Sequence, residues 1–292
     1  MCKVQAANAG EGGGWRACIA YFRNICQILG FRGGQSAATK GTWKIVKWVW
    51  GVALLMVFAS PALAGPPFET DDPDVVDLGH WEVDMFSTGT AAGGGAGGFG
   101  PAIEVNHGIL PDLMVHTIVP LAYAHAPGGG TRFGPGDIEL GAEYRFLDTG
   151  NKWNLPEVAT FPLLEVPAGD AAHGLGAGHW HGYVPLWLEE TWGKWTSYGG
   201  GGYWVNPGPG NRNYWFSGVV LQNQVADDFA LGGEVFHQTP VSIGGRSSTG
   251  FNLGVTYDFS DHYHLLCSAG RGLESANLTN RFTYYAAFQW TF

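Results

Sequence analysis

The chain has 292 residues, of which 14% are charged and 47 are glycine, and its formal net charge at pH 7 is −10. Soluble domains average about 25% charged residues, so this composition argues against an ordinary soluble fold. The excess of acidic residues excludes nucleic acid as a partner, because binding to phosphates requires a basic surface. The second half of the chain has no apolar run of about 18 to 20 residues, which argues against a helical membrane protein.

A candidate targeting signal lies near the N-terminus. Lys44 and Lys47 precede an apolar run over residues 48–58, and the run is followed by Ala62-Leu63-Ala64. A basic flank, a short apolar run and an Ala-x-Ala ending are typical of a secretory signal peptide. We therefore expect a signal peptide over residues 40–64 with cleavage near Ala64. A membrane anchor is the alternative, although the run is short for a spanning helix.

Residues 1–39 do not fit this scheme, because they place the start of the chain far ahead of the basic region. We interpret them as a non-native leader that results from a start codon assigned too early. Cys2, Cys18 and Cys26 lie in this leader, which leaves Cys267 alone after the cleavage site. A single thiol cannot form an internal disulfide. Loss of residues 1–64 leaves eight Lys and Arg against 24 Asp and Glu.

Residues 65–79 are acidic and interrupted by proline. We expect them to form no regular secondary structure and to be a periplasmic segment that precedes the barrel described below. Clustered carboxylates are the ligands of hard cations, but the spacing here matches no calcium loop, and a solvated segment also accounts for it. The carboxylates in question belong to Asp71, Asp72, Asp74 and Asp77.

From residue 80 onward, runs of about ten residues alternate with gaps rich in turn-forming residues. Several runs have period two, as in 137–147, where Ile138, Leu140 and Ala142 alternate with polar residues or glycine. That period indicates β-strands with two different faces, and ten residues suffice to cross a bilayer at a tilt. The twelve runs are 80–88, 100–107, 113–125, 137–147, 156–166, 179–190, 195–205, 214–225, 229–238, 250–259, 262–270 and 281–292.

The gaps between the runs alternate in length. The short ones are 108–112, 148–155, 191–194, 226–228 and 260–261, and the long ones are 89–99, 126–136, 167–178, 206–213, 239–249 and 271–280. Short periplasmic turns and long extracellular loops are typical of outer-membrane barrels. The sequence therefore predicts an all-β protein, an antiparallel transmembrane β-barrel of twelve strands over residues 80–292. A soluble lipocalin-type barrel would have fewer strands and charged outer faces.

The last run has aromatic residues at alternate positions and ends on Phe292. It resembles the closing strand of bacterial outer-membrane barrels, which carries the recognition signal for the barrel-assembly machinery. The resemblance implies the bacterial outer membrane as the location, with its lipid and this machinery as partners. A C-terminal strand of a secreted β-sandwich is the alternative. The assembly signal would comprise Tyr284, Phe288, Trp290 and Phe292.

A second resemblance lies at the start of the barrel. The sequence Pro-Phe-Glu-Thr-Asp-Asp-Pro at residues 67–73, followed by Gly-His-Trp-Glu at residues 79–82, resembles the N-terminal pattern of an outer-membrane transporter family. That family is named for the meta pathway of phenol degradation. The similarity is specific over about 20 residues and architectural over the rest of residues 65–292. It implies a barrel that moves small, often aromatic, molecules.

If the apolar face of each strand meets lipid, the other face lines the lumen. A charge on the lipid face at mid-bilayer costs about 2–4 kcal/mol, so the charged residues are expected to point inward. We predict a narrow, weakly cation-favouring passage for small solutes, with a hydrogen-bonded plug of side chains as the alternative. The lumen-lining candidates are Glu82, Asp84, Glu104, Glu139, Glu143, Arg145, Glu165, His181, Glu189, Glu234 and Asp258.

Two polar motifs indicate other chemistry. His179 and His181 share a strand face close to His173 and could share a metal ion, but no third ligand stands at a fixed spacing. The tripeptide Ser260-Asp261-His262 contains the residue types of a catalytic triad, although consecutive residues in a turn cannot adopt the triad geometry. We therefore predict no metal, no cofactor and no enzyme activity.

The glycines at 199–202 are unusual within a strand. They indicate close approach of another group, such as a substrate path or an inserted segment 65–79, or else a flexible strand end. Two rivals to the channel hypothesis stay open. The first is a structural or adhesive barrel with a closed lumen. The second is an outer-membrane lipid hydrolase, against which the absence of a His-x-Ser sequence counts.

Overall fold

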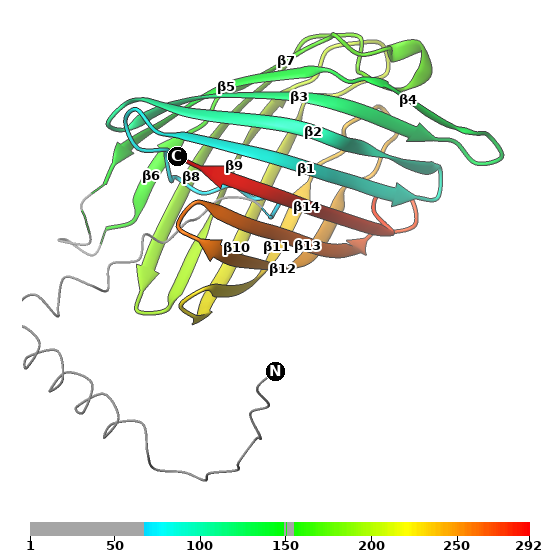
Figure 1. Cartoon of the computed structure of the whole chain (residues 1–292). Coiled ribbons are helices and arrows are strands. Elements are labelled where there is room, and N and C mark those ends of the chain that lie inside the picture. Colours follow the sequence, from blue (N-terminus) through cyan, green and yellow to red (C-terminus); the bar gives the residue numbers. More distant parts are fainter. Residues whose placement is uncertain (1–66, 149, 151–154) are drawn as a thin grey trace, which may run out of the picture. The chain divides into compact units, whose positions relative to one another are not determined.

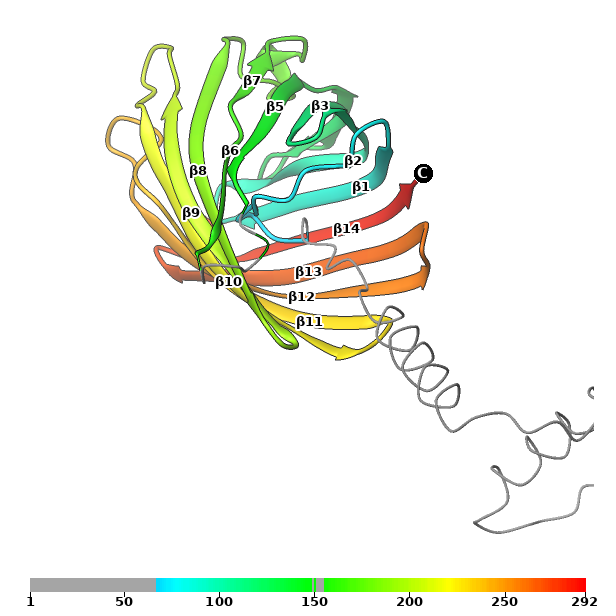
Figure 2. The ribbon, with the colours of Figure 1, turned by 90° about the vertical axis from the view of Figure 1, so that its left-hand side faces the viewer.

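The computed structural model describes residues 67–148, 150 and 155–292. The leader predicted over 1–39 and the signal peptide predicted over 40–64 lie outside these residues. The described part of the chain is a closed antiparallel β-barrel (Figure 1, Figure 2). Its one helical element is the short 3-10 turn η1 (Ala171–His173). No helix in the described ranges is long and apolar enough to cross a membrane.

Fourteen strand segments form the barrel wall, and most of them coincide with the predicted runs to within a few residues. Their bounds are β1 (Trp81–Ala92), β2 (Gly95–Leu110), β3 (Leu113–His125), β4 (Thr131–Pro135), β5 (Ile138–Leu147), β6 (Glu157–Thr160), β7 (Leu163–Val166), β8 (His181–Trp192), β9 (Trp195–Val205), β10 (Tyr214–Ala226), β11 (Phe229–Gln238), β12 (Ser248–Ser260), β13 (Tyr263–Glu274) and β14 (Phe282–Thr291).

These segments occupy twelve strand positions, because two strands are interrupted. β4 and β5 pair with successive parts of β3, and β6 and β7 both lie between β5 and β8. The second interruption falls at Phe161-Pro162, where proline supplies no backbone donor for the ladder. β14 pairs with both β13 and β1, which closes the ring. The predicted twelve-stranded antiparallel barrel is confirmed.

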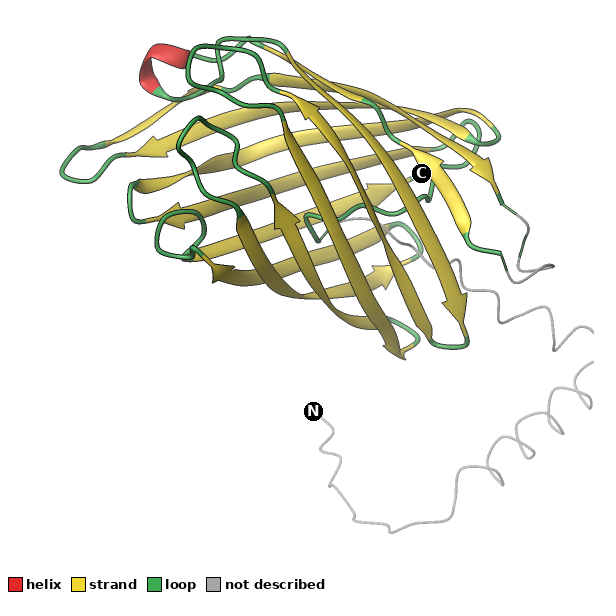
Figure 3. Cartoon of the chain, turned by 180° about the vertical axis from the view of Figure 1, so that it is seen from behind, coloured by secondary structure: helices red, strands yellow, loops and turns green. Residues whose placement is uncertain are grey.

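The two ends of the barrel differ as predicted, with two exceptions. Two-residue turns at 111–112, 193–194, 227–228 and 261–262 lie at the end where the first strand begins and the last one finishes, whereas most connections at the other end are longer (Figure 3). The connection predicted to be short over 148–155 spans nine residues, because β5 ends at Leu147 and β6 begins at Glu157. The long loop predicted over 89–99 is wrong. β1 and β2 continue through this stretch and are joined by Gly93 and Gly94 alone.

The glycines of this stretch allow close packing of strands. A Cβ atom on Gly98 would lie 2.1 Å from the carbonyl oxygen of Thr88, and one on Gly89 would lie 1.9 Å from the hydroxyl of Tyr123. Only glycine leaves room for these neighbours. The glycine-rich sequence predicts a loop, but in the structure it marks tightly paired strands.

The outer face of the barrel is apolar. Val184 on β8 and Leu253 on β12 each expose 63% of their surface, and Met85 on β1 exposes 58%. Their sequence neighbours point inward and are buried, as shown by Asp84 at 0% exposure and Asn252 at 2%. Apolar residues outside and polar residues inside is the arrangement of a barrel that sits in lipid and encloses a polar lumen.

Candidate functional site

A stretch of the chain that precedes the barrel runs through its lumen. Residues 67–77 are here called the inserted segment. The beginning of this segment contacts β10, β11, β12 and β13, and its later residues contact β2 and β5. Figure 2 shows this part of the chain, in cyan, within the ring of strands. The sequence predicts residues 65–79 as a segment in front of the barrel and names insertion against the glycines at 199–202 as one possibility. The structure places residues 67–77 inside the barrel, against other glycines.

Glu234 on β11 holds the beginning of the inserted segment. Its carboxylate accepts the backbone N–H groups of Glu69 and Thr70, both at 3.0 Å, and an N–H group of the Asn252 side chain. Ser268 on β13 donates a hydrogen bond to the carbonyl oxygen of Pro67. Hydrogen bonds to a charged group contribute about 1.5–3 kcal/mol each, so this carboxylate is the main polar anchor at this end.

Three glycines on the wall make room for the inserted segment. A Cβ atom on Gly218 of β10 would lie 1.9 Å from the hydroxyl oxygen of Thr70. Cβ atoms on Gly232 and Gly254 would lie 3.1 and 2.7 Å from the ring of Phe68. The glycines at 199–202 serve a different purpose, because Cβ atoms there would meet the backbone of neighbouring strands, such as Gly218 and Leu186.

The far half of the inserted segment is held by charge and by apolar contact. Asp74 forms an ion pair with Arg145 of β5 at 3.2 Å. Val75 and Val76 pack against a buried cluster inside the barrel. That cluster consists of Met114, Phe161, Tyr183, Trp187, Phe216 and Phe236. Burial, together with the nearby charges of Asp74, Asp71 and Glu189, raises the pKa of the Asp72 carboxyl above its usual range.

The inserted segment separates two cavities in the lumen. One, of about 600 Å³, lies at the end where β1 begins and Phe292 is found, and its lining includes Asp71, Glu143 and Phe161. The lining of the other, of about 510 Å³, includes most residues of the loop stretch 241–246 and residues 278–280. Glu69 borders both cavities. We call them the terminal-end cavity and the loop-end cavity.

The predicted lumen residues are located on the inner side of the wall. Asp84, Glu104, Glu143, Glu189 and Glu234 are buried, with exposures of 0 to 8%. The others, Glu82, Glu139, Arg145, Glu165, His181 and Asp258, are partly buried. Their part in solute passage stays a prediction, as does the assembly signal, for which Phe288, Trp290 and Phe292 are exposed and Tyr284 is half-buried.

A hydrogen-bonded network links several of these residues through a histidine that sequence reasoning missed. His116 on β3 lies with Nδ1 2.7 Å from the side-chain oxygen of Asn106 and Nε2 3.1 Å from Glu139. Asn106 donates to both Glu82 and Glu104 at 3.0 Å. The signal was present in the sequence, because His116 alternates with outward-facing Val115 within the predicted run 113–125.

The other motifs do not form sites. His173 pairs with Asp170 and His181 with Glu165, so these two rings have separate partners, and the ring of His179 lies beside Gly208. His262 lies with Nδ1 2.9 Å from the carbonyl oxygen of Thr291, and its backbone N–H, rather than its ring, contacts the hydroxyl of Ser260. Within the described ranges, the one group of three mutually close metal-ligand side chains is Asp72, Asp74 and Glu189.

Comparisons with known proteins concern the fold. No protein-family model matches the sequence, and no curated protein matches it. An outer membrane channel from Pseudomonas putida F1 is structurally similar, with a TM-score of 0.59 and 16% identity over 77% of this chain and 100% of that one. The KdgM porin, in complex with disordered oligogalacturonate, gives a TM-score of 0.50 at 10% identity over 72% of this chain and 99% of its own.

The NanC porin is similar to the same degree, with a TM-score of 0.50 at 8% identity over 71% of this chain and 98% of its own. At these identities the similarity shows the fold alone. The chain therefore has the closed β-barrel fold that outer-membrane channels and porins also have.

Proposed function

We propose that this chain is an outer-membrane channel for small solutes in which the inserted segment controls passage. One observation carries the proposal: two cavities, of about 600 and 510 Å³, lie on either side of a single segment that borders both. The contacts described above hold this segment by side chains, whereas strand-to-strand ladders hold the wall. Release of the segment would join the two cavities without breaking the barrel.

The apolar outer face supports an outer-membrane location. Closed barrels with a polar interior are stable in lipid, because every backbone group in the wall is paired. On this proposal a signal peptide cleaved near Ala64 directs export of the chain. The barrel-assembly machinery then recognises the aromatic C-terminal strand.

The lining of the terminal-end cavity supports small solutes with both an apolar and a polar part. Phe68, Met114 and Phe161 form one portion of the lining, and Glu104, His116 and Glu139 another. A phenol-like compound presents an aromatic face and a hydroxyl group, which match these two portions. Aromatic or hydrophobic compounds are therefore the proposed solutes, and the acidic lining is proposed to favour cations over anions.

The test is ion selectivity in a planar bilayer under a KCl gradient. We expect discrete openings whose reversal potential is shifted from zero toward the equilibrium potential of potassium, because lumen carboxylates attract cations. The double variant Glu139→Gln, Glu143→Gln should shift the reversal potential toward zero. The matched variant Glu274→Gln, at an exposed position near the end of β13, should leave it unchanged. Anion-selective openings would contradict the role given to the carboxylates.

A closed structural barrel is the second candidate, and the tight fit of the inserted segment favours it. Thr70 and Asp72 are 1% and 2% exposed, so this part of the segment is packed as closely as a protein core. The two candidates differ in one outcome. A structural barrel stays silent in the bilayer even after the segment is removed.

A further inference from the structure

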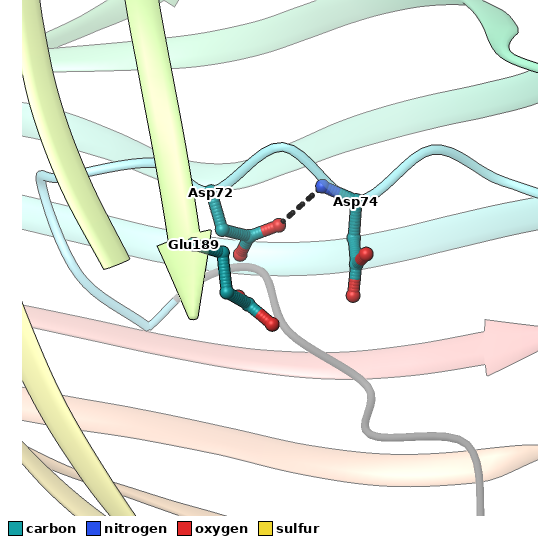
Figure 4. A group of neighbouring side chains, drawn as sticks. All are labelled: Asp72, Asp74 and Glu189. Atoms are coloured by element: carbon teal, nitrogen blue, oxygen red, sulfur yellow. Dashed lines mark hydrogen bonds between the residues drawn. The ribbon is translucent and has the colours of Figure 1, made fainter. Parts of the chain in front are cut away.

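Three carboxylates meet where the inserted segment passes β8. Asp72 and Asp74 come from the segment and Glu189 from the strand, and Figure 4 shows the three side chains close together. One oxygen of each lies within 4.8 Å of the others. Calcium binds carboxylate oxygens at about 2.3–2.6 Å, so ligands on opposite sides of the ion lie up to about 5 Å apart. Oxygens of all three side chains therefore fit around one ion.

One oxygen of Asp72 and one of Glu189 lack a hydrogen-bond donor among the described residues. Asp72 and Glu189 are 2% and 6% exposed, and Oδ2 of the first and Oε2 of the second have no hydrogen-bond partner. The other oxygen of Asp72 accepts the backbone N–H of Asp74 at 2.9 Å, which fixes the carboxylate in place. Glu143, 1% exposed, adjoins the group and adds a third such oxygen, Oε1. Buried carboxylates find a hydrogen-bond donor or a cation, or else they take up a proton.

The nearby arginine does not balance this charge. Arg145 contacts Asp74 and Glu157 at 3.2 and 3.1 Å, and its other guanidinium nitrogen lies 3.6 Å from Asp112 and 3.9 Å from Asp148. One positive charge is thus shared by four carboxylates. Asp72, Glu143 and Glu189 add three more acidic groups next to it, so the site favours a divalent cation.

We propose that Asp72, Asp74 and Glu189 bind a calcium ion that fastens the inserted segment to β8, with Glu143 beside it. Calcium accepts six to eight oxygens in flexible geometry, including bidentate carboxylates, whereas magnesium demands a near-ideal octahedron. Carboxylates contributed by two separate stretches of chain suit the more tolerant ion. Asp72, Asp74 and Glu143 line the terminal-end cavity, which gives the ion a route to the site.

The site rests on the geometry alone, whereas its role as a latch also rests on the proposed function. An ion held by both the segment and the wall adds a bridge to the hydrogen bonds at Glu234. Removal of the ion takes away this bridge, and the segment is expected to leave the lumen more often.

The first experiment measures calcium binding by the full chain in detergent after treatment with EGTA. Equilibrium dialysis should give one saturable site per chain. The variants Glu189→Gln and Asp72→Asn should each raise the Kd at least about tenfold, because each removes one charged ligand. The control Glu165→Gln changes a lumen carboxylate that pairs with His181 and should keep the Kd within about twofold. Magnesium should compete at least about tenfold less well.

Two outcomes of the binding measurement would overturn the calcium site. The site is overturned if the wild-type chain shows no saturable calcium binding at millimolar calcium, or if Glu189→Gln binds as tightly as the wild type. The measurement on the wild-type chain needs no variant, so it can overturn the site even if a variant fails to fold.

Conductance tests the latch separately. EGTA should increase the open time of the wild-type channel by about tenfold or more, given a coupling of the usual size of 1–3 kcal/mol, and should leave Glu189→Gln unaffected. Saturable calcium binding with unchanged conductance would overturn the latch. A chain that stays silent with or without calcium would contradict the proposed function while the binding result stands.

Discussion

Deletion of residues 68–77 is expected to increase the conductance of the barrel on the order of tenfold, since twelve strands enclose a lumen wider than those of filled eight-stranded barrels. The physical reason is that the inserted segment lies in the lumen between cavities of about 600 and 510 Å³ and borders both. The wall should survive the deletion, because β1 pairs with β14 and β2 through its own backbone. Conductance in a planar bilayer is the measurement, and circular dichroism checks the fold.

The matched control removes exposed residues from a loop. Residues 128–130 are three glycines in the connection between β3 and β4, and all are exposed. Their deletion should leave the conductance unchanged. A folded barrel that lacks residues 68–77 and conducts like the full chain would show that the segment does not obstruct the lumen. A folded but silent one would favour the closed structural barrel.

The second large effect is expected on stability, at the outer face of β10. Val219 lies near the middle of this strand and is 55% exposed. Val219→Arg should lower the free energy of unfolding by about 2–4 kcal/mol, because it places a charge on the lipid face at mid-bilayer. Denaturant unfolding of the barrel in phospholipid vesicles measures this quantity.

Val225 supplies the control on the same strand and the same face. It is 53% exposed and lies one residue from the end of β10. Val225→Arg should lower the free energy of unfolding by only about 0–1 kcal/mol, because a charge near the membrane interface stays hydrated. Equal losses of unfolding free energy for the two variants would mean that the cost of the charge does not depend on its depth in the membrane. The barrel would then not span the bilayer in the proposed way.

The strands could be predicted from the sequence because each carries its own local signal. In β5 and β12, apolar and polar residues alternate along one short stretch, and the outer residues need only lipid as a partner. The lumen candidates followed from the same alternation. Local patterns of this kind do not depend on where a distant part of the chain lies.

The inserted segment could not be predicted in the same way, because its position depends on contacts with distant residues. Thr70 meets Gly218, and the backbone at Glu69 meets Glu234 more than 160 positions away. Proline and clustered acids indicated only an irregular segment, and glycines in a strand do not name the group that approaches them. The loop predicted over 89–99 is wrong for a related reason. The glycines there are required by close packing against neighbouring strands, and the local sequence does not show which strands those are.

The most direct test of the central claim is a reversible disulfide between the inserted segment and the wall. A Cβ atom on Gly218 would lie 3.1 Å from the Cβ of Thr70, close to the separation of about 3.5–4.5 Å in disulfides. The variant Thr70→Cys, Gly218→Cys, with Cys267→Ala to remove the native thiol, is oxidised and studied in a planar bilayer before and after reduction. We predict that the oxidised barrel forms the cross-link and is closed, and that reduction restores openings. A folded barrel that forms no cross-link, or one that conducts equally in both states, would contradict the account.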